Sequence, residues 1–227
     1  MYEKKRLTFS SKSHRSIDGI MQAQIAAFLP NYRVDQVLDY GAGNSPYRHI
    51  ISCDRYITAD ISQNSAGDID HLIGPGDSLP LNTASINLVL LLDVLEHIVD
   101  PDAVMAEIRR LLDPQGSLII SVPFLYREHE TPYDFARYTV FGMCELVKRH
   151  KGKVVRIRKA GNIYYTVLSL FLERGISNGE YSRLGLVGRI INRCLGMLIP
   201  VFAPILRKAP SEDDGIYHHL LLEVSFD

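Results

Sequence analysis

Residues 37–47, VLDYGAGNSPY, decide the fold of this chain. The apolar run that ends at Leu38 predicts a buried strand, and Gly41 and Gly43 behind it predict a tight turn. Glycines let the backbone approach a ligand that any Cβ would keep away. Polar residues that can cap a helix follow, so we expect a helix to begin near Ser45. Strand, glycine turn and helix N-terminus together are typical of the first half of a nucleotide-binding βαβ unit.

The residues around the glycines indicate which nucleotide is bound. A dinucleotide fingerprint needs a third glycine, and Pro46 stands there, which disfavours a pyrophosphate ligand. Asp39 precedes the turn and favours a ligand with a positive group. The stretch resembles motif I, D-x-G-x-G, of the class I S-adenosylmethionine (SAM) methyltransferases. The resemblance implies that Asp39 lies near the methionine ammonium and that Gly41 and Gly43 make room for the methionine; the alternative is a turn without a ligand.

Two further acidic residues follow at the spacings of that family. Asp60 comes directly after a predicted strand at residues 55–59, where a carboxylate can accept both ribose hydroxyls. The resemblance gives Asp60 the same role. In the segment GDSLPL the resemblance places Asp77 beside the adenine, with Ser78 next to it in the cofactor site. A plain Gly-Asp-Ser turn is the alternative for this segment.

A third signal follows the apolar strand predicted at residues 87–92. The sequence DVLEHI, residues 93–98, resembles the V-L-E-H run of small-molecule methyltransferases. It should lie at the carboxyl end of the strand, where open α/β sheets bind ligands. We expect Asp93 to contact the cofactor and Glu96 and His97 to contact the substrate. The alternative for Glu96 and His97 is that they brace the loop.

A polar loop at residues 123–139 follows the strand predicted at residues 117–122. It resembles the H-x-x-P-x-D-x-x-R-x-T segment of a bacterial methyltransferase group associated with cell-envelope glycans. His129 is the predicted general base, because an imidazole takes a proton near neutral pH. Asp134 would orient it or pair with Arg137, and catalysis by proximity alone is the alternative to a base. The residues of this loop predicted to bind substrate are Tyr126, Tyr133 and Arg137.

Charge and cysteine content restrict the function classes. The net charge of −1 gives no global signal for nucleic acid, so we expect no nucleic-acid partner. Cys53, Cys144 and Cys194 lie far apart, and neither they nor the 8 histidines show metal-ligand spacing, so no metal is predicted. No signal peptide is apparent, which predicts a cytoplasmic protein with free thiols.

The order of predicted elements suggests a domain division. Residues 1–30 would form a tail and a helix at 17–29. Residues 31–161 plus 215–227 would form the SAM-binding domain, and residues 162–214 a helical insertion. The expected fold is α/β, a Rossmann-like doubly wound sheet of seven strands. The last strand would be antiparallel and would follow the insertion.

The insertion is both apolar and basic. Nine basic and two acidic residues lie between Arg156 and Lys208. Its longest uncharged run, at 194–206, is too short for a membrane span, which takes about 20 residues. Small and polar residues between 185 and 196 fall on one helical stripe. These features predict contact with the inner face of a membrane through residues 162–210; a helical cap or a homodimer face is the alternative.

Taken together, the motifs predict a SAM-dependent methyltransferase. The expected reaction is in-line transfer of methyl to a small-molecule acceptor, first of all a hydroxyl of a sugar, glycan or lipid-linked metabolite. A non-catalytic SAM-binding assembly or regulatory subunit is the alternative from another class. A nicotinamide-dependent oxidoreductase is disfavoured by the missing third glycine.

Overall fold

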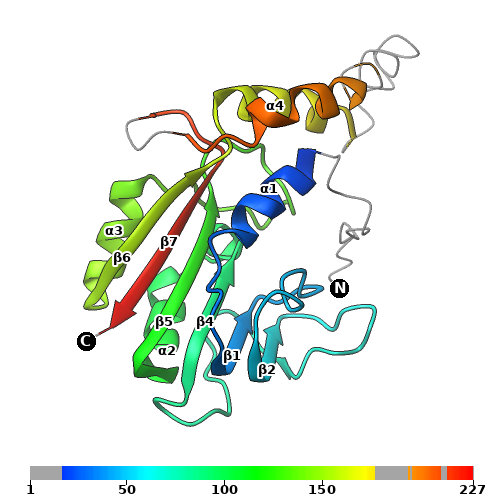
Figure 1. Cartoon of the computed structure of the whole chain (residues 1–227). Coiled ribbons are helices and arrows are strands. Elements are labelled where there is room, and N and C mark those ends of the chain that lie inside the picture. Colours follow the sequence, from blue (N-terminus) through cyan, green and yellow to red (C-terminus); the bar gives the residue numbers. More distant parts are fainter. Residues whose placement is uncertain (1–16, 177–193, 195, 211–213, 227) are drawn as a thin grey trace.

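The computed structural model describes residues 17–176, 194, 196–210 and 214–226, which form one seven-stranded sheet with helices on both faces (Figure 1). The strand order is β3-β2-β1-β4-β5-β7-β6. In chain order the elements are α1 (Ile17–Ala26), β1 (Val34–Tyr40), β2 (Cys53–Asp60), β3 (His71–Leu72), β4 (Ile86–Leu92), the 3-10 helix η2 (Leu95–His97), α2 (Pro101–Leu111), β5 (Leu112–Pro123), α3 (Val140–Arg149), β6 (Gly152–Ala160), α4 (Ile163–Ile176) and β7 (His219–Phe226).

The sheet is parallel except at one side. Strands β1 to β5 pair in parallel, whereas β7 runs antiparallel between β5 and β6. The carboxyl ends of the parallel strands therefore share one edge, called here the carboxyl edge, where open α/β sheets bind ligands. The predicted Rossmann-like sheet of seven strands with an antiparallel last strand is confirmed.

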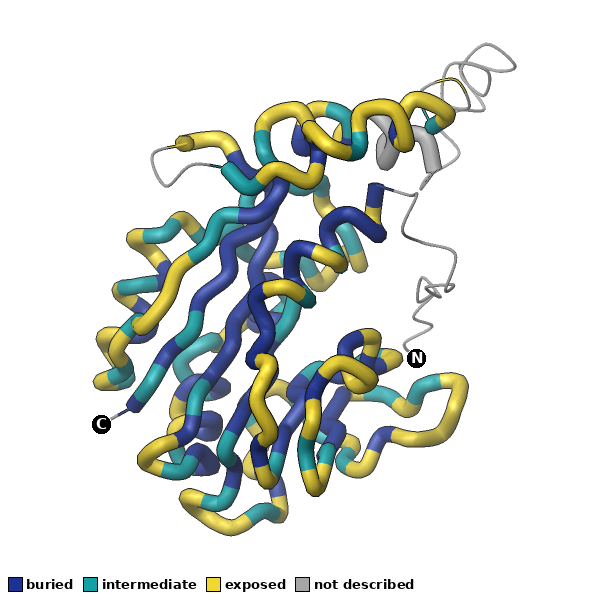
Figure 2. The backbone as a smooth tube through the Cα atoms, viewed as in Figure 1, coloured by how far each residue is buried: buried dark blue, intermediate teal, exposed yellow. Residues whose placement is uncertain are grey.

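Two apolar layers sandwich the sheet. On β4, Val89 and Leu91 point into the layer formed with α2 and α3, and Leu88 and Leu90 point into the layer formed with α1 and α4. Successive strand residues face opposite sides, so a strand covered on both faces is a continuous apolar run. The central strands are accordingly buried along their length (Figure 2).

The expectation that a helix begins near Ser45 is wrong. Residues 44–50 form consecutive turns. Ser45 has a φ of 45°, in the left-handed region, whereas a residue that caps a helix start has extended backbone. The turns still bury Tyr47 and Ile51 in the layer beside α1.

Two segments depart from regular strand pairing. Residues 67–73 contribute only the two residues of β3, because Asp70 accepts hydrogen bonds from the Thr58 amide at 2.9 Å and the Thr58 hydroxyl at 3.0 Å in place of ladder pairing. Residues 113–116 lie inside β5, where the register against β4 shifts.

The insertion leaves the sheet near the carboxyl edge. Ala160 of β6 and Pro123 of β5 both pair with His219, so α4 begins beside the end of β5. Residues 196–206 form a second helix. The side-chain amide of Asn162 donates to the carbonyl of Ile205 in this helix at 2.7 Å and to that of Lys208 just after it at 2.9 Å. Residues 177–193, with most of the predicted stripe, lie outside the described residues. Within the described part of the chain, no helix is long and apolar enough to cross a membrane.

Candidate active site

The glycine turn and the end of β2 are joined by Asp60. Its Oδ2 accepts a hydrogen bond from the Gly43 amide at 2.9 Å, and its Oδ1 accepts one from the Ser62 amide at 3.2 Å. A carboxylate oxygen can accept more than one hydrogen bond. The buried Asp60 therefore lies at the carboxyl edge, directly beside the turn, as the sequence predicts for a group that binds a ribose diol.

Gly41 is needed for a contact that the sequence alone does not show. Its φ is 75°, and a Cβ added there would come within 2.4 Å of Val94 Cγ2. The turn after β1 therefore packs directly on the segment after β4. That close approach brings the predicted cofactor and substrate segments side by side.

Asp39 is a buried acid at the end of β1. Its Oδ2 accepts a hydrogen bond from the Tyr56 hydroxyl at 2.8 Å. Burial, only partly offset by the hydrogen bond from Tyr56, raises its pKa to about 6. A cationic ligand group beside Asp39 would favour the ionised form. The position suits the ammonium that the motif resemblance assigns to it.

Asp77 and Ser78 are exposed and lie at the margin of the site. Asp77 Oδ2 accepts the Gly74 amide at 2.9 Å, so it closes its own turn. The neighbouring Gly76 amide donates to the hydroxyl of Tyr40, the last residue of β1, at 3.2 Å. The segment is therefore held against the glycine turn. Asp77 can close its own turn and still lie beside an adenine, so the two alternatives for this segment are compatible.

Asp93 follows β4 with a φ of 56°. Its Oδ1 accepts the Ser121 hydroxyl at 2.6 Å and lies 3.4 Å from His219 Nε2. Burial by itself would raise the pKa of Asp93, but the charge and hydrogen bond of His219 outweigh it, so the net direction is downward. Asp93 is therefore an ionised group at the carboxyl edge.

Glu96 has the most unusual environment of the predicted site residues. Its side chain is fully buried in η2, and neither carboxylate oxygen has a hydrogen-bond partner among the described residues. Burial, followed by the charge of Asp93, raises its pKa well above the usual range. A buried carboxyl without partners is costly, and such a group in a native protein calls for an explanation.

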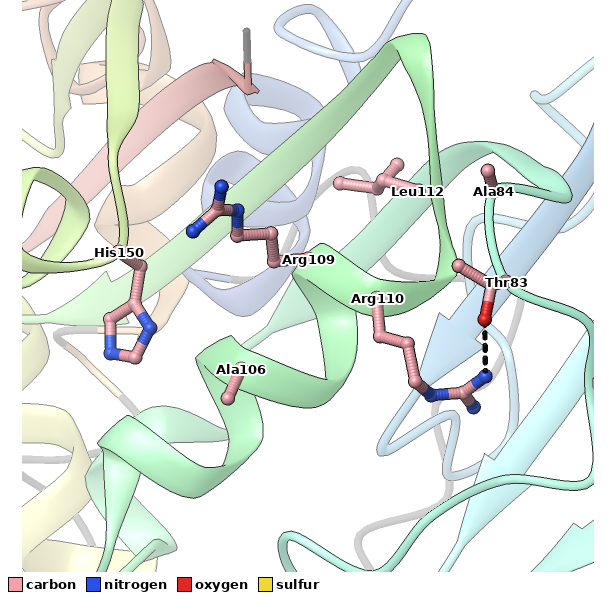
Figure 3. A pocket seen from close by; sticks show the side chains of 7 residues that line it. All are labelled: Thr83, Ala84, Ala106, Arg109, Arg110, Leu112 and His150. Atoms are coloured by element: carbon pink, nitrogen blue, oxygen red, sulfur yellow. Dashed lines mark hydrogen bonds between the residues drawn. The ribbon is translucent and has the colours of Figure 1, made fainter.

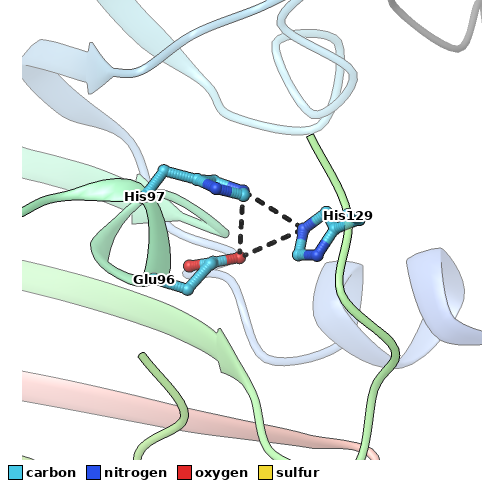
Figure 4. Close-up of side chains that lie close together, drawn as sticks. All are labelled: Glu96, His97 and His129. Atoms are coloured by element: carbon cyan, nitrogen blue, oxygen red, sulfur yellow. Dashed lines mark hydrogen bonds and ion pairs between the residues drawn. The ribbon is translucent and has the colours of Figure 1, made fainter. Parts of the chain in front are cut away.

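Two histidines face Glu96 (Figure 4). His97 Nε2 and His129 Nε2 lie 3.7 and 3.8 Å from Glu96 Oε1 and 3.1 Å from each other. Burial and then the charge of His97 lower the pKa of His129. The structure thus brings together His97 and His129 from two different loops.

Asp134 makes both of the contacts considered for it, with His129 and with Arg137. Its Oδ2 lies 3.1 Å from His129 Nδ1 and accepts the His129 amide at 2.8 Å. Arg137 donates to the same oxygen from Nη2 at 2.7 Å. Burial opposes ionisation, but the bond from Arg137 prevails and brings the pKa of Asp134 to about 2. Asp134 is therefore ionised and orients the His129 ring.

The loop that carries these groups is docked on η2. The Phe135 amide donates to the Glu96 carbonyl at 2.7 Å, and Arg137 Nη2 donates to the Arg127 carbonyl at 2.9 Å. Tyr133 contributes its carbonyl oxygen, 2.6 Å from His97 Nδ1, while its side chain is exposed. Arg137 and Tyr133 thus hold the site together through their contacts within the loop.

Sequence reasoning missed two histidines at the start of β7. Tyr126 packs edge-on against His129 and His218, with ring centroids 4.9 and 5.1 Å apart. His218 is buried and its Nδ1 lies 2.6 Å from Nδ1 of His219, the residue that reaches Asp93. In the sequence these residues form a His-His pair directly before the last apolar run. The pair reaches the site only because β7 lies beside β5.

A pocket of about 400 Å³ lies away from this cluster (Figure 3). It is lined by residues that precede β4, belong to α2, begin β5 or follow α3, among them Ala84, Arg109, Leu112 and His150. These belong to the amino ends of β4 and β5, opposite the carboxyl edge. The pocket is therefore separate from the predicted cofactor site.

Comparisons with known proteins agree with this geometry. Residues 38–120 match the family model described as a methyltransferase domain. The chain has the class I methyltransferase fold. Among curated proteins no match is found. The methyltransferase-domain match spans the glycine turn, Asp60, Asp77 and the segment with Asp93 and Glu96.

Several solved structures share the methyltransferase fold. One is in the complex between the Haloferax volcanii Trm112 methyltransferase activator and a methyltransferase, with 21% identity, coverage of 63% of this chain and 73% of that one, and a TM-score of 0.52. Another is a possible histamine N-methyltransferase from Thermotoga maritima, with 14% identity, 94% and 91% coverage and a TM-score of 0.57. A third is Haemonchus contortus phosphoethanolamine N-methyltransferase 2 in complex with S-adenosyl-L-methionine, with 12% identity, 99% and 61% coverage and a TM-score of 0.56.

Proposed function

We propose that this protein transfers a methyl group from S-adenosylmethionine to the hydroxyl of a small molecule. The observation that carries the proposal is the bond from the Gly43 amide to Asp60 Oδ2 at the carboxyl edge, inside a match to a methyltransferase domain. This bond holds a buried carboxylate beside a turn that follows the buried Asp39, and a carboxylate in that position is suited to a ribose diol. S-adenosylmethionine is the cofactor supported by the domain match and by the neighbour solved with it.

Three acidic residues would each contact a different part of the cofactor. Asp60 would accept the ribose hydroxyls, because it lies at the carboxyl edge beside the glycine turn and a carboxylate oxygen can accept more than one hydrogen bond. Asp39 would face the methionine ammonium, and Asp77 would border the adenine. The sulfonium methyl would then point toward the segment after β4, because Gly41 packs on Val94.

Methyl transfer requires chiefly alignment of acceptor oxygen, methyl carbon and sulfur. The bond from oxygen to methyl forms as the bond from methyl to sulfur breaks, and the hydroxyl proton must leave. His129 is the candidate base because the ionised Asp134 holds its Nδ1 and leaves Nε2 facing the site. Replacement of His129 by alanine tests that role, since an unchanged rate would assign catalysis to alignment alone.

Calorimetric titration with SAM and with NAD is the decisive test of cofactor choice. We expect saturable binding of SAM, no binding of NAD, and a loss of affinity of about tenfold or more in Asp60→Ala, because a carboxylate-to-diol contact is a charge-assisted hydrogen bond. Asp113→Ala, an acid at the start of β5, is the matched control. NAD binding, or full SAM affinity in Asp60→Ala, contradicts the proposal.

The acceptor is to be found by incubating the enzyme and SAM with cell extract. Mass spectrometry should detect a metabolite that gains the mass of one methylene group, and sugars and lipid-linked glycans are the first class to inspect. SAM binding without any methylated product would favour the alternative of an assembly or regulatory subunit. The neighbour from Haloferax volcanii shows that this fold occurs in a complex with a protein activator.

The insertion supplies a surface suited to membrane contact. We call the exposed apolar side chains of α4 and of residues 196–206 the insertion surface; its members are Ile163, Tyr164, Val167, Leu170, Met197, Leu198, Val201, Phe202 and Ile205. The exposed bases Arg207 and Lys208 follow directly after the second helix of this surface. Apolar side chains bordered by bases bind anionic interfaces. We propose that this surface binds the inner face of a membrane, close to the carboxyl edge.

Vesicle flotation tests the membrane contact. The protein should float with vesicles of phosphatidylglycerol and phosphatidylcholine, and Phe202→Asp should abolish flotation. Phe141→Asp is the matched control, because Phe141 is an exposed phenylalanine of α3 outside the insertion surface. A dimer in sedimentation that Phe202→Asp dissociates, without flotation, would favour the homodimer instead.

A further inference from the structure

The side chains of Glu96, His97 and His129 converge on one point. The three nearest atoms are Glu96 Oε1 and the two histidine Nε2 atoms, separated by 3.1, 3.7 and 3.8 Å. Metal–ligand bonds of about 2.0–2.1 Å at a tetrahedral angle separate two ligand atoms by about 3.3 Å. The three atoms therefore already lie close to the spacing of ligands around one ion (Figure 4).

The outer nitrogens of both rings are occupied by acceptors. His97 Nδ1 lies 2.6 Å from the Tyr133 carbonyl, and His129 Nδ1 lies 3.1 Å from Asp134 Oδ2. A carbonyl and an ionised carboxylate can only accept, so each Nδ1 carries the proton in a neutral ring. Both Nε2 atoms then present lone pairs to each other. An Nδ1–H that donates to a carboxylate or a carbonyl is also the usual support of a metal-binding histidine.

Glu96 provides the independent observation. It is fully buried, aims Oε1 at the two Nε2 atoms, and neither of its oxygens has a hydrogen-bond partner among the described residues. When Glu96 is ionised, three electron-rich atoms therefore meet with no donor between them. A cation at their centre would satisfy all three, because buried charges are paired or coordinate metals.

We propose that Glu96, His97 and His129 bind a divalent first-row transition-metal ion such as Zn²⁺ or Fe²⁺. Two imidazoles and one carboxylate are typical ligands of such ions. This replaces the expectation of no metal, which considered only spacing along the chain. The histidine side chains are 15% and 19% exposed, so the ligand set is open on one side. Open coordination positions are typical of catalytic rather than structural sites.

The open side suggests what the ion does, and this step rests on the proposed function. The acceptor hydroxyl would bind the ion, which lowers its pKa so that its proton passes to solvent water. The oxygen then forms its bond to the methyl carbon as the carbon–sulfur bond breaks, which yields the methyl ether and S-adenosylhomocysteine. In the ion-bound protein His129 Nε2 is a ligand and is not the base.

Titration of the chelator-treated full chain with Co²⁺ tests the site without any substrate. We expect one saturable equivalent with visible absorption from the bound ion, followed by displacement with Zn²⁺. His97→Asn and Glu96→Gln should each weaken binding by about 100-fold, and the supporting variant Asp134→Asn by about 10-fold. His49→Asn is the matched control, because His49 is an exposed histidine outside the cluster.

Several outcomes overturn the site. No saturable binding of Co²⁺ or Zn²⁺ would do so, and so would equal affinity in His97→Asn and His49→Asn. Circular dichroism and SAM titration identify a variant that is unfolded, and in that case His129→Asn replaces it. Metal binding without methyl transfer would contradict the proposed function alone. Methyl transfer that persists in chelator, together with absent metal binding, would contradict the site alone.

Discussion

The buried carboxyl of Asp39 should make the stability of the cofactor-free protein fall as pH rises. Its folded pKa is about 6, raised by burial above the ordinary value of 3.8. A group with a raised pKa stabilises the fold below its unfolded pKa, and this contribution is lost as pH rises toward its folded pKa. The Asp39→Asn variant carries a neutral group of similar shape at every pH.

The size of the effect follows from the two pKa values. The shift in the Asp39 pKa from 3.8 to about 6 corresponds to a contribution of about 3 kcal/mol to the free energy of unfolding at low pH. Between pH 4.5 and 7.5 the linkage relation gives a change of about 2 kcal/mol in the difference between wild type and Asp39→Asn. Urea denaturation at these two pH values, each with both proteins, measures it. The variant should gain relative stability at the higher pH.

Binding of SAM should favour the ionised form of Asp39, whereas burial alone favours the neutral form. Because an ammonium beside Asp39 favours the ionised form, wild-type protein should release up to about half a proton per SAM bound near pH 6, and Asp39→Asn should release none. Calorimetry in buffers of different ionisation enthalpy counts that proton. A stability difference that is flat between pH 4.5 and 7.5 would refute the buried carboxyl. Equal SAM affinity and proton release in both proteins would refute the ammonium contact.

The remaining predictions concern the glycine turn, the loop after β5 and the segment that follows α1. Gly41→Ala should lower the free energy of unfolding by several kcal/mol, because φ at Gly41 is 75° and the added Cβ would meet Val94. In urea denaturation the double variant with Val94→Ala should recover part of that loss. Full additivity of the two substitutions would contradict the contact. Asp134, with a folded pKa of about 2, should contribute stability that is present above pH 4 and lost as pH falls toward 2; the difference between wild type and Asp134→Asn should shrink over that range. Arg156→Ala should lower stability by about 1 kcal/mol, because the guanidinium lies 4.0 Å from the Phe28 ring centroid and bonds the Phe28 carbonyl, and thermal denaturation that leaves the melting temperature unchanged would contradict this.

The sequence was most informative where residues close together in the chain determine the structure. The apolar run of β4 predicts a strand covered on both faces, and the spacing from Gly43 to Asp60 predicts that they meet at one edge, as they do. Local signals failed after the glycines, because Ser45 takes a left-handed conformation that its residue type does not dictate.

The parts that could not be predicted depend on segments distant in the chain. Glu96 and His97 were predicted as site residues, but the loss of hydrogen-bond partners by Glu96 depends on the loop that docks through the Phe135 amide. The approach of His129 to His97 has the same cause. His219 reaches Asp93 only because β7 enters the sheet beside β5.

The place of β7 between β5 and β6 has a consequence for how the chain matures on the ribosome. β6 pairs only with β7 in the described sheet, so residues 152–160 leave the ribosome with no neighbouring strand and must wait through the synthesis of the insertion. Until residues 219–226 emerge, β5 presents an open edge, which is prone to wrong pairing. The imidazole of His219 arrives in the same step. The nascent chain therefore completes its sheet and gains the contact between His219 and Asp93 in the same step.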